Sequence, residues 1–467
     1  MNKNTYTSNS SFLDTPDNVI YDIFLKWLDE ETVKKISFDL KEPDRMLQLR
    51  LESLKIFSTI KKPNFWPDIS SVDFSNLVYY AKPKKEFTGS TDSRDKIPEN
   101  IKNIFQRLNI PEAEQQYLAW VWWQFDSSVV YHKLKEKRQQ SWIIFDDISV
   151  AIQEHPDLVK KYFMQLVPPT DHQFAALHWA VRSGWTFVYI PKWIQLSDPL
   201  QAYFRMNTYE WWQFEHTLII LEDESSCSYI EWCSAPKYDK RSLHAWCVEI
   251  FVWKNSNMRY TSVENRSTNT FNLNTKRAII DENSHIERIW WNLWSWATML
   301  YPCSILKWDN STSDNLSLVV ASTNQHQDVW AKVIHIWKNT TSNIVSKSIS
   351  KNWWNNIYRG LIKIASTAKN AVSSTHCDAL LLDNISISDT IPTIQVNTND
   401  ATISHEATAW KIDNNQLFYL MSRWLSEESA TAMIVNGFLS SITKKLPLEY
   451  AWELNHLIEL EMEKSVG

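Results

Sequence analysis

Glycine is almost absent from this chain. Its 467 residues include 5 glycines, whereas proteins commonly contain about 7% glycine. A chain of this length needs glycine wherever φ is positive or two backbones approach closely, because glycine has no Cβ. Other residues must therefore occupy such positions. The shortage is matched by an excess of 26 tryptophans.

Cysteine pairs, long apolar runs and a strong net charge are also lacking. The cysteines are Cys227, Cys233, Cys247, Cys303 and Cys377, with no CxxC spacing. This pattern argues against a zinc ribbon and favours a reducing compartment. No run is long enough to cross a membrane, and the polar start MNKNTYTSNSS lacks the apolar part of a secretory signal. The net charge of −6 gives no electrostatic reason to expect nucleic acid. We therefore expect neither a membrane nor a nucleic-acid partner.

A phosphate-binding loop is missing as well. No GxxxxGK[ST] motif occurs, even when every tryptophan is read as glycine. Since that loop cradles the phosphates of a bound nucleotide, ATP hydrolysis is expected from a partner.

Three regions differ in hydrophobic pattern. Residues 1–165 are predicted to be mostly helical, residues 166–412 to consist of short alternating strands, and residues 413–467 to be helical again. The predicted helices cover residues 28–54, 98–134, 147–163, 416–423, 427–442 and a last one from Pro447, with an extended segment at 77–80. The predicted strands include residues 186–190, 217–221, 248–252 and 317–320.

Asparagines recur at even intervals in the strand-rich region. They are Asn255, Asn283, Asn310, Asn339, Asn370 and Asn399, separated by 28, 27, 29, 31 and 29 residues. Such a period indicates a solenoid, and strands without intervening helices indicate a parallel β-helix. Asparagine suits the turns because it tolerates the left-handed conformation. The alternative, a β-sandwich, has turns more often than once per ~29 residues. We predict a mainly β fold with a right-handed parallel β-helix (β-solenoid) core and helical regions at both ends.

Three motifs carry reactive side chains. Cys233 lies in SYIEWCSAP, Cys377 follows His376 in THCDALLLDNISISDTIP, and His405 and Glu406 begin HEAT. Judged by residue type and spacing alone, a strand cysteine is more often a small buried hydrophobic residue. A His-Glu pair is more often the end of a strand.

These motifs resemble the SufB/SufD family, the scaffold subunits of the SUF iron–sulfur cluster assembly system. The resemblance extends from about residue 25 to 467. It includes LVPPTDHQFAALH (166–178), QFEHTLII (213–220), TKRA (275–278), IVSKSISK (344–351) and LPLEYA (446–451). The chain departs from the family mainly where tryptophan stands for glycine, and at Arg266, where the family tends to have tryptophan.

The resemblance implies a scaffold that is not an enzyme. In a SufB-type member Cys233 accepts sulfur from a desulfurase system, and sulfur passes through the β-helix interior to Cys377. A transient iron–sulfur cluster then forms near Cys377, His405 and Glu406. Some members have a glutamate before the histidine, where this chain has Ser404. The resemblance leaves open whether a flavin takes part.

The resemblance also implies partners. SufD pairs with SufB through the β-helices, and the ATPase SufC binds the C-terminal helices and hydrolyses ATP. The expected location is the cytoplasm, with the plastid stroma as the alternative. Two other readings of the sequence are the paralogous SufD-type subunit and a β-helix enzyme acting on polysaccharides. Cys233, Cys377 and HEAT together favour SufB over SufD. Paired tryptophans in turns do not form the flat ladder that a carbohydrate-binding groove needs.

The tryptophans themselves suggest a recoding. Many stand where the family has glycine, for example Trp193, Trp232 and Trp424. UGA differs from the glycine codon GGA at one base, so we hypothesise that the gene uses UGA for glycine, as some bacterial lineages do. On this hypothesis, many of these tryptophans should lie at turns or be unusually exposed in a structure of the printed chain.

Overall fold

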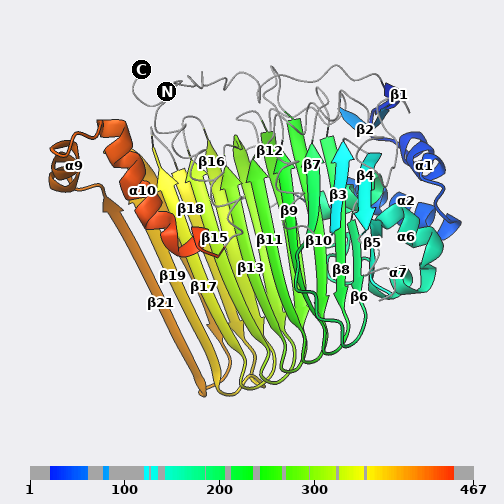
Figure 1. Ribbon diagram of the computed structural model, residues 1–467. Helices are drawn as coiled ribbons and strands as arrows, with labels where there is room; N and C mark the ends of the chain where they lie inside the picture. The colour runs from blue at the N-terminus through cyan, green and yellow to red at the C-terminus, as the bar shows by residue number, and fades with distance from the viewer. Residues whose placement is uncertain are drawn as a thin grey trace.

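The computed structural model describes residues 21–61, 77–83, 120–125, 128–134, 142–184, 186–205, 212–234, 242–265, 270–293, 295–321, 325–351 and 355–445. In this part the chain is mainly β. A long parallel solenoid has helices at its N-terminal and C-terminal ends (Figure 1). The predicted mainly β fold and parallel solenoid are thereby confirmed.

Two sheets form the walls of the solenoid. From residue 186 onward, strands consecutive in the chain alternate between the sheets, so each coil adds one strand to each sheet. The first sheet contains β5 (Ile144–Asp147), β6 (Thr186–Ile190), β8 (Trp212–Leu221), β10 (Ser242–Val252), β12 (Thr270–Ile280), β14 (Ala297–Leu306), β16 (His326–His335), β18 (Asn355–Ile364) and β20 (Ile387–Val396). The second contains β3 (Trp120–Phe125), β4 (Ser128–Leu134), β7 (Leu200–Arg205), β9 (Ser226–Ser234), β11 (Asn257–Asn265), β13 (His285–Leu293), β15 (Thr312–Ala321), β17 (Thr341–Ser350), β19 (Ala371–Leu381) and β21 (Ala401–Lys411). The four predicted strands coincide with β6 or lie within β8, β10 and β15.

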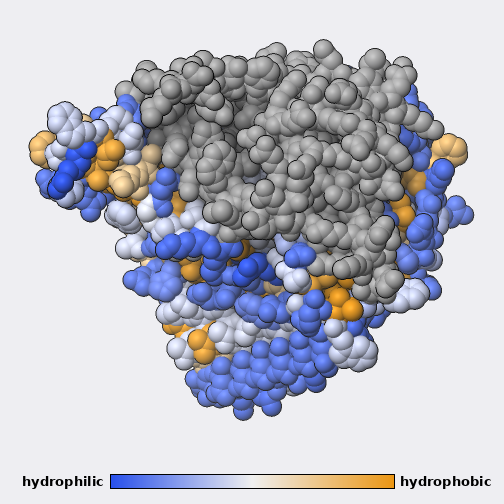
Figure 2. Space-filling model, in the orientation of Figure 1, coloured by the Kyte–Doolittle hydropathy of each residue, from blue (hydrophilic) through white to orange (hydrophobic). Residues whose placement is uncertain are grey.

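The short turns between the sheets are built on the predicted asparagines. Asn255, Asn283, Asn310, Asn339 and Asn370 all have φ between 54° and 58°, the left-handed region that asparagine tolerates. Side-chain amides stack from coil to coil, as where Asn310 donates to Asn283 at 2.8 Å. Asn399, the sixth predicted position, does not adopt a positive φ. The edge that carries these turns is hydrophilic (Figure 2).

The N-terminal region combines helices with short strands. Its elements are β1 (Tyr21–Lys26), α1 (Glu30–Asp39), α2 (Asp44–Thr59), β2 (Val78–Pro83), α6 (Ile148–Glu154), α7 (Pro156–Tyr162) and α8 (Gln173–Val181). The helix predicted over 28–54 divides into α1 and α2 around Pro43. The helix predicted over 147–163 divides before Pro156, because proline cannot donate the next hydrogen bond of a helix.

One N-terminal prediction was wrong. Residues 120–125 and 128–134 form β3 and β4, an antiparallel pair that extends the second sheet, where a helix was expected. β-branched and aromatic residues dominate this stretch, and pairing with β7 outweighed its approximate helical spacing. The rest of that predicted helix, residues 98–119, lies outside the described residues.

A buried ion cluster ties α2 to the end of α8. The carboxylate of Glu42 contacts Arg50 at 2.6 Å and Arg182 at 2.8 Å, and all three side chains are about 1% exposed. Burial alone would raise the pKa of Glu42. The two guanidinium groups outweigh burial and lower this pKa to about 2. The cluster therefore holds an ionised carboxylate inside the N-terminal core.

Two helices follow the solenoid, α9 (Asn414–Met421) and α10 (Glu427–Thr443). α10 begins at the predicted cap, where Ser426 accepts the Ser429 N–H at 3.2 Å, and runs back across the second sheet (Figure 1). α9 projects beyond the last coil and buries no residue. The last predicted helix, from Pro447, lies outside the described residues. Among the described helices, none has the length and apolar character needed to cross a bilayer.

Two sets of described tryptophans bear on the recoding hypothesis. Trp27, Trp142, Trp193 and Trp424 have φ between 58° and 75° and are 57–98% exposed, as the hypothesis requires. Buried in the core instead are Trp232, Trp246, Trp290 and Trp291, so the expectation of exposure was wrong for them. The indole N–H groups of Trp290 and Trp291 nevertheless have no hydrogen-bond partner among the described residues. A buried donor without an acceptor costs about 1–3 kcal/mol.

Candidate functional site

Cys377 lies inside the solenoid, near its C-terminal end. It is 5% exposed and lines a narrow cavity between the two sheets, together with Gln327, Ser346 and Tyr358. The cavity volume is about 20 Å³, above the roughly 10–15 Å³ that one water molecule needs. The thiol therefore borders a small space between the sheets.

The thiol of Cys377 is protonated in this environment. Burial raises its pKa to about 12, and the neighbouring carboxylate of Asp378 adds to the effect, while the Tyr358 phenol opposes it. A thiolate is the form that attacks sulfur or binds metal. Burial therefore favours the protonated thiol, and a positive charge such as a metal ion would favour the thiolate.

His405 and Glu406 face opposite sides of β21. β21 pairs with β19 in register, with Thr375 opposite His405, His376 opposite Glu406 and Cys377 opposite Ala407. Because side chains alternate along a strand, His405 shares the inner face with Cys377. Their Cα atoms are one strand and two positions apart, roughly 8 Å from standard strand spacings.

The two predicted polar ligands differ in their partners. Nε2 of His405 is buried and has no hydrogen-bond partner among the described residues. Glu406 is largely exposed, and its carboxylate lies 3.1 Å from Nδ1 of His376 on the outer face. The structure thus brings His405 to the side of Cys377 and separates Glu406 from it.

The coil that carries His405 is the open end of the described solenoid. β20 and β21 are the last strands of their sheets, so each has one edge without a strand partner among the described residues. Apolar side chains are exposed along β20, including Ile387, Ile391 and Ile394. Unpaired edges with apolar side chains favour association with another sheet.

Cys233 also faces the interior but lies far from Cys377. It is fully buried on β9, beside Glu264 of β11 and Phe204 of β7. Five strand spacings separate β9 from β19, roughly 24 Å at about 4.8 Å each. The two predicted cysteines therefore do not form one site.

Charged residues fill the interior next to Cys233. Lys276 of β12 reaches across from the other sheet and contacts Glu264 at 3.0 Å and Glu231 at 3.8 Å. It also donates to the Ser262 hydroxyl at 2.7 Å. Burial raises the pKa of Glu231 well above its usual value, and Lys276 opposes this shift. This cluster gives the Cys233 end of the interior a positive charge between two carboxyl groups.

A chain of hydrogen bonds leads from this cluster towards Cys377. Asn272 donates to both Glu264 and Asn292, the latter at 3.2 Å. Asn292 in turn donates to Gln327, which lines the cavity beside Cys377. The interior is therefore polar along one continuous path between the two cysteines.

A parallel row of inward side chains is interrupted. Neighbouring strands place Glu231, Ser262, Trp290, Ser317, Ser346 and Cys377 in register. The indole of Trp290 packs with Leu300, Val319 and Val329 in a small apolar cluster. A tryptophan thus fills the interior between the serines.

Sequence reasoning missed most of this polar interior. Glu231, Glu264, Asn272, Asn292 and Gln327 were not identified as site residues, and Lys276 was noticed only within the TKRA motif. The available signal was their position: polar residues alternate in phase with the inward positions of strands that are otherwise apolar. The inward positions can be assigned only once the strand register is known.

Comparisons with known proteins converge on one family. The family model for "SUF system FeS cluster assembly, SufBD core domain" matches residues 204–438. An iron–sulfur cluster assembly SufBD family protein of Staphylococcus aureus strain MRSA252 is 48% identical over 440 residues, 94% of each chain. The iron–sulfur cluster assembly protein SufB of Bacillus subtilis strain 168 is 46% identical over 440 residues, again 94% of each chain.

Proposed function

The chain belongs to the SufBD family of the SUF iron–sulfur cluster assembly system, and from this we propose that it is the SufB-type scaffold, which accepts sulfur at Cys233 and builds a cluster beside Cys377. The observation that carries the proposal is the continuous polar path inside the solenoid, from the Lys276 cluster through Asn292 and Gln327 to the cavity at Cys377.

Sulfur acceptance at Cys233 is a thiol–persulfide exchange. The Cys233 thiolate attacks the outer sulfur of the donor persulfide. A new S–S bond forms on Cys233, and the donor leaves as a thiolate. The ammonium of Lys276, held in the neighbouring row of side chains, supports negative charge in this part of the interior. The buried polar path then gives sulfur a route through the interior.

The ligand set at the other end suits an iron–sulfur unit under construction. A thiolate and a neutral imidazole are both ligands of such units. Cys377 and His405 face the same side, and the unpartnered Nε2 of His405 is free to bind iron. We propose Glu406 as a further ligand, reached from the outer face once the open end is covered. Since clusters commonly take four protein ligands, the remaining ones come from a partner.

The open end indicates where the partner binds. We propose that a SufD-type subunit docks its own β-helix onto β20 and β21, whose edges and apolar side chains are exposed. A SufC-type ATPase would bind the helices after residue 412, where α9 exposes Phe418, Tyr419 and Met421. We also propose the division into an N-terminal region (1–165), a β-helix core (166–412) and a C-terminal helical region (413–467). ATP hydrolysis is the partner's activity.

Two alternatives carry less weight. A SufD-type assignment does not account for two interior cysteines joined by a polar path. The interpretation as a polysaccharide-active enzyme is set aside because the chain belongs to the SufBD family. The five cysteines are all free, which suits a reducing compartment, and we propose the cytoplasm.

Anaerobic reconstitution tests the proposal. The chain is co-expressed with a SufC-type ATPase and a SufD-type subunit, and the complex is purified and supplied with ferrous iron, cysteine and a desulfurase. We expect co-purification of all three subunits and a visible absorption band that needs both iron and cysteine. Recovery of the chain alone, or a complex that stays colourless beside an active desulfurase, would contradict the proposal.

A further inference from the structure

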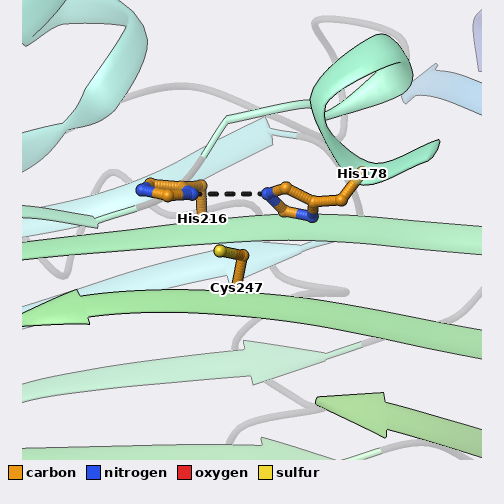
Figure 3. Close-up of side chains that lie close together, drawn as sticks. All are labelled: His178, His216 and Cys247. Atoms are coloured by element: carbon orange, nitrogen blue, oxygen red, sulfur yellow. Dashed lines mark hydrogen bonds between the residues drawn. The ribbon is translucent and has the colours of Figure 1, made fainter. Parts of the chain in front are cut away.

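A cluster of metal-binding side chains lies outside the iron–sulfur site. His178, His216 and Cys247 are fully buried where α8 packs on the outer face of the first sheet (Figure 3). One ligand atom of each lies within 4.8 Å of the other two. None of the three belongs to the path between Cys233 and Cys377.

The fold positions these three residues. β8 and β10 are parallel neighbours, and their register places His216 directly opposite Cys247 on the same face. The last turn of α8 brings His178 over that pair. Nε2 of His178 lies 3.3 Å from Nδ1 of His216. Two nitrogens bound to a tetrahedral Zn²⁺ at about 2.0–2.1 Å each are roughly 3.3–3.4 Å apart, so the spacing already suits such an ion.

Glu249 orients His216. Its carboxylate lies 3.3 Å from Nε2 of His216 and accepts the backbone N–H groups of Met164, Leu166 and Val167 at 2.6–2.9 Å. The contact is an ion-pair distance, and Nε2 makes no hydrogen bond among the described residues. A carboxylate this close still favours a proton on Nε2, which leaves the Nδ1 lone pair facing His178. Carboxylate–histidine–metal arrangements place the carboxylate on the same side of the ring.

His178 has an unused nitrogen. When its Nε2 donates to His216, its Nδ1 is buried without a hydrogen-bond partner among the described residues. Moving the proton to Nδ1 frees the lone pair of Nε2 for a metal. Without a metal, the two facing nitrogens share a single proton. A metal ion would instead bind the lone pairs of both nitrogens.

An acidic group lies next to the proposed ligands. Zn²⁺ bound by one thiolate carries a net charge of +1, and the carboxyl group of Glu249 lies 3.3 Å from the His216 ring. Arg182 and Arg277 act on this cluster, and both are already paired: Arg182 with Glu42 at 2.8 Å, and Arg277 with Asp171. The Phe163 ring lies against His216 with centroids 4.8 Å apart and helps to exclude water. A buried ion is tolerated when it is paired with groups of opposite charge.

We propose that His178 Nε2, His216 Nδ1 and Cys247 Sγ bind one Zn²⁺ ion, which fastens α8 to the outer face of the solenoid. Binding displaces the thiol proton of Cys247 and leaves one tetrahedral position for a small fourth ligand. The role is structural and independent of cluster assembly, since the ion joins the N-terminal region to β8 and β10.

Metal analysis of the full-length chain tests the site. The wild-type protein is produced in zinc-supplemented medium, and bound zinc is measured by mass spectrometry of the metal. Cys247→Ala removes the thiolate. Cys303→Ala is the matched control, because Cys303 is also buried and lies on the same outer face, on β14. We expect one zinc per chain in the wild type and in Cys303→Ala, and less than a tenth of that in Cys247→Ala.

A spectroscopic measurement needs no variant. Cobalt(II) added to the apo-protein should give the intense visible bands of a tetrahedral ion together with thiolate-to-cobalt charge transfer. A wild-type chain that binds no zinc and shows no such bands overturns the proposal. So does zinc that remains in full after Cys247→Ala. A Cys377→Ala variant that loses its iron–sulfur cluster should keep its zinc, which separates this proposal from the assembly function.

Discussion

Cys377 and His405 face the same side of two neighbouring parallel strands, one strand and two positions apart. The residue after His405, Glu406, faces the other side and contacts His376. His405 and Glu406 are neighbours in sequence, but their side chains lie on opposite faces of the second sheet. The inner surface borders the cavity at Cys377, and the outer surface is exposed to solvent or to a partner.

Replacing Cys377 by alanine should abolish cluster formation. The variant loses the one cysteine described at the inner site, while alanine fits the strand, so the solenoid and partner binding should persist. Iron and sulfide are measured on the reconstituted complex, with Cys303→Ala as control. Unchanged iron and sulfide in Cys377→Ala would refute the assignment of this cysteine.

Replacing His405 and replacing Glu406 should lower the amount of bound iron to different extents. We expect His405→Ala to lower bound iron several-fold, because it removes the inward imidazole. Glu406→Gln should lower bound iron less, because it mainly breaks the exposed contact with His376. Iron retained by the purified complex after gel filtration provides the comparison. An equal loss in both variants would show that the outer carboxylate is as close to the iron as the inner imidazole.

Cys233→Ser should block sulfur entry without destroying the assembly site. Persulfide should no longer form on the chain when cysteine and a desulfurase supply sulfur, whereas sulfide added chemically should still yield a cluster at Cys377. Peptide mass spectrometry locates the persulfide. Persulfide forming equally at Cys227 or Cys247 would argue against a dedicated entry residue.

Glu42 should make the N-terminal core sensitive to acid. Its pKa is lowered in the folded chain to about 2 from an ordinary value of 4.5, so its ion pairs stabilise the fold fully above pH 4.5. That contribution is lost as the pH falls from 4.5 towards 2. Breaking a buried ion pair costs roughly 3–5 kcal/mol. Thermal unfolding should therefore show Glu42→Gln to be less stable than wild type at pH 7, with the difference shrinking below pH 4.5. A constant difference across this range would exclude the linkage.

Peptide mass spectrometry of the native protein should find glycine at positions 193 and 424. Trp193 and Trp424 have positive φ and are 70% and 98% exposed, and a residue with a Cβ pays roughly 1 kcal/mol or more in that conformation. Position 290 is a third test, because a glycine there would open the interior row between Ser262 and Ser317. Tryptophan at all three positions would end the recoding hypothesis.

The solenoid was predictable because each of its short turns requires the same backbone conformation. Each short turn needs a left-handed residue, and asparagine supplied it at five of the six predicted positions. The β3–β4 pair was not predictable from local pattern, because pairing with β7 decides its conformation and residues 120–134 show an approximate helical spacing of apolar residues. Tertiary pairing outweighed local periodicity there.

The candidate site was predictable only in part. Motifs identified Cys233, Cys377, His405 and Glu406, but could not show that Glu406 faces away from Cys377, since inner and outer faces depend on strand register. The cluster of His178, His216 and Cys247 gave no spacing signal. Its members come from a helix and two strands, 38 and 31 residues apart in sequence, and meet only after α8 packs on the sheet.

The single-sided pairing of β20 and β21 has a consequence for hydrogen exchange. An inner coil opens only by breaking its contacts with two neighbours, whereas the last coil breaks its contacts with one. Amide protection should therefore decline along the solenoid towards residues 387–411, and this end should fray first. A nascent cluster held by His405 would sit on the most easily opened coil of the described molecule, so the local unfolding that releases it requires no disruption of the coils that hold Cys233.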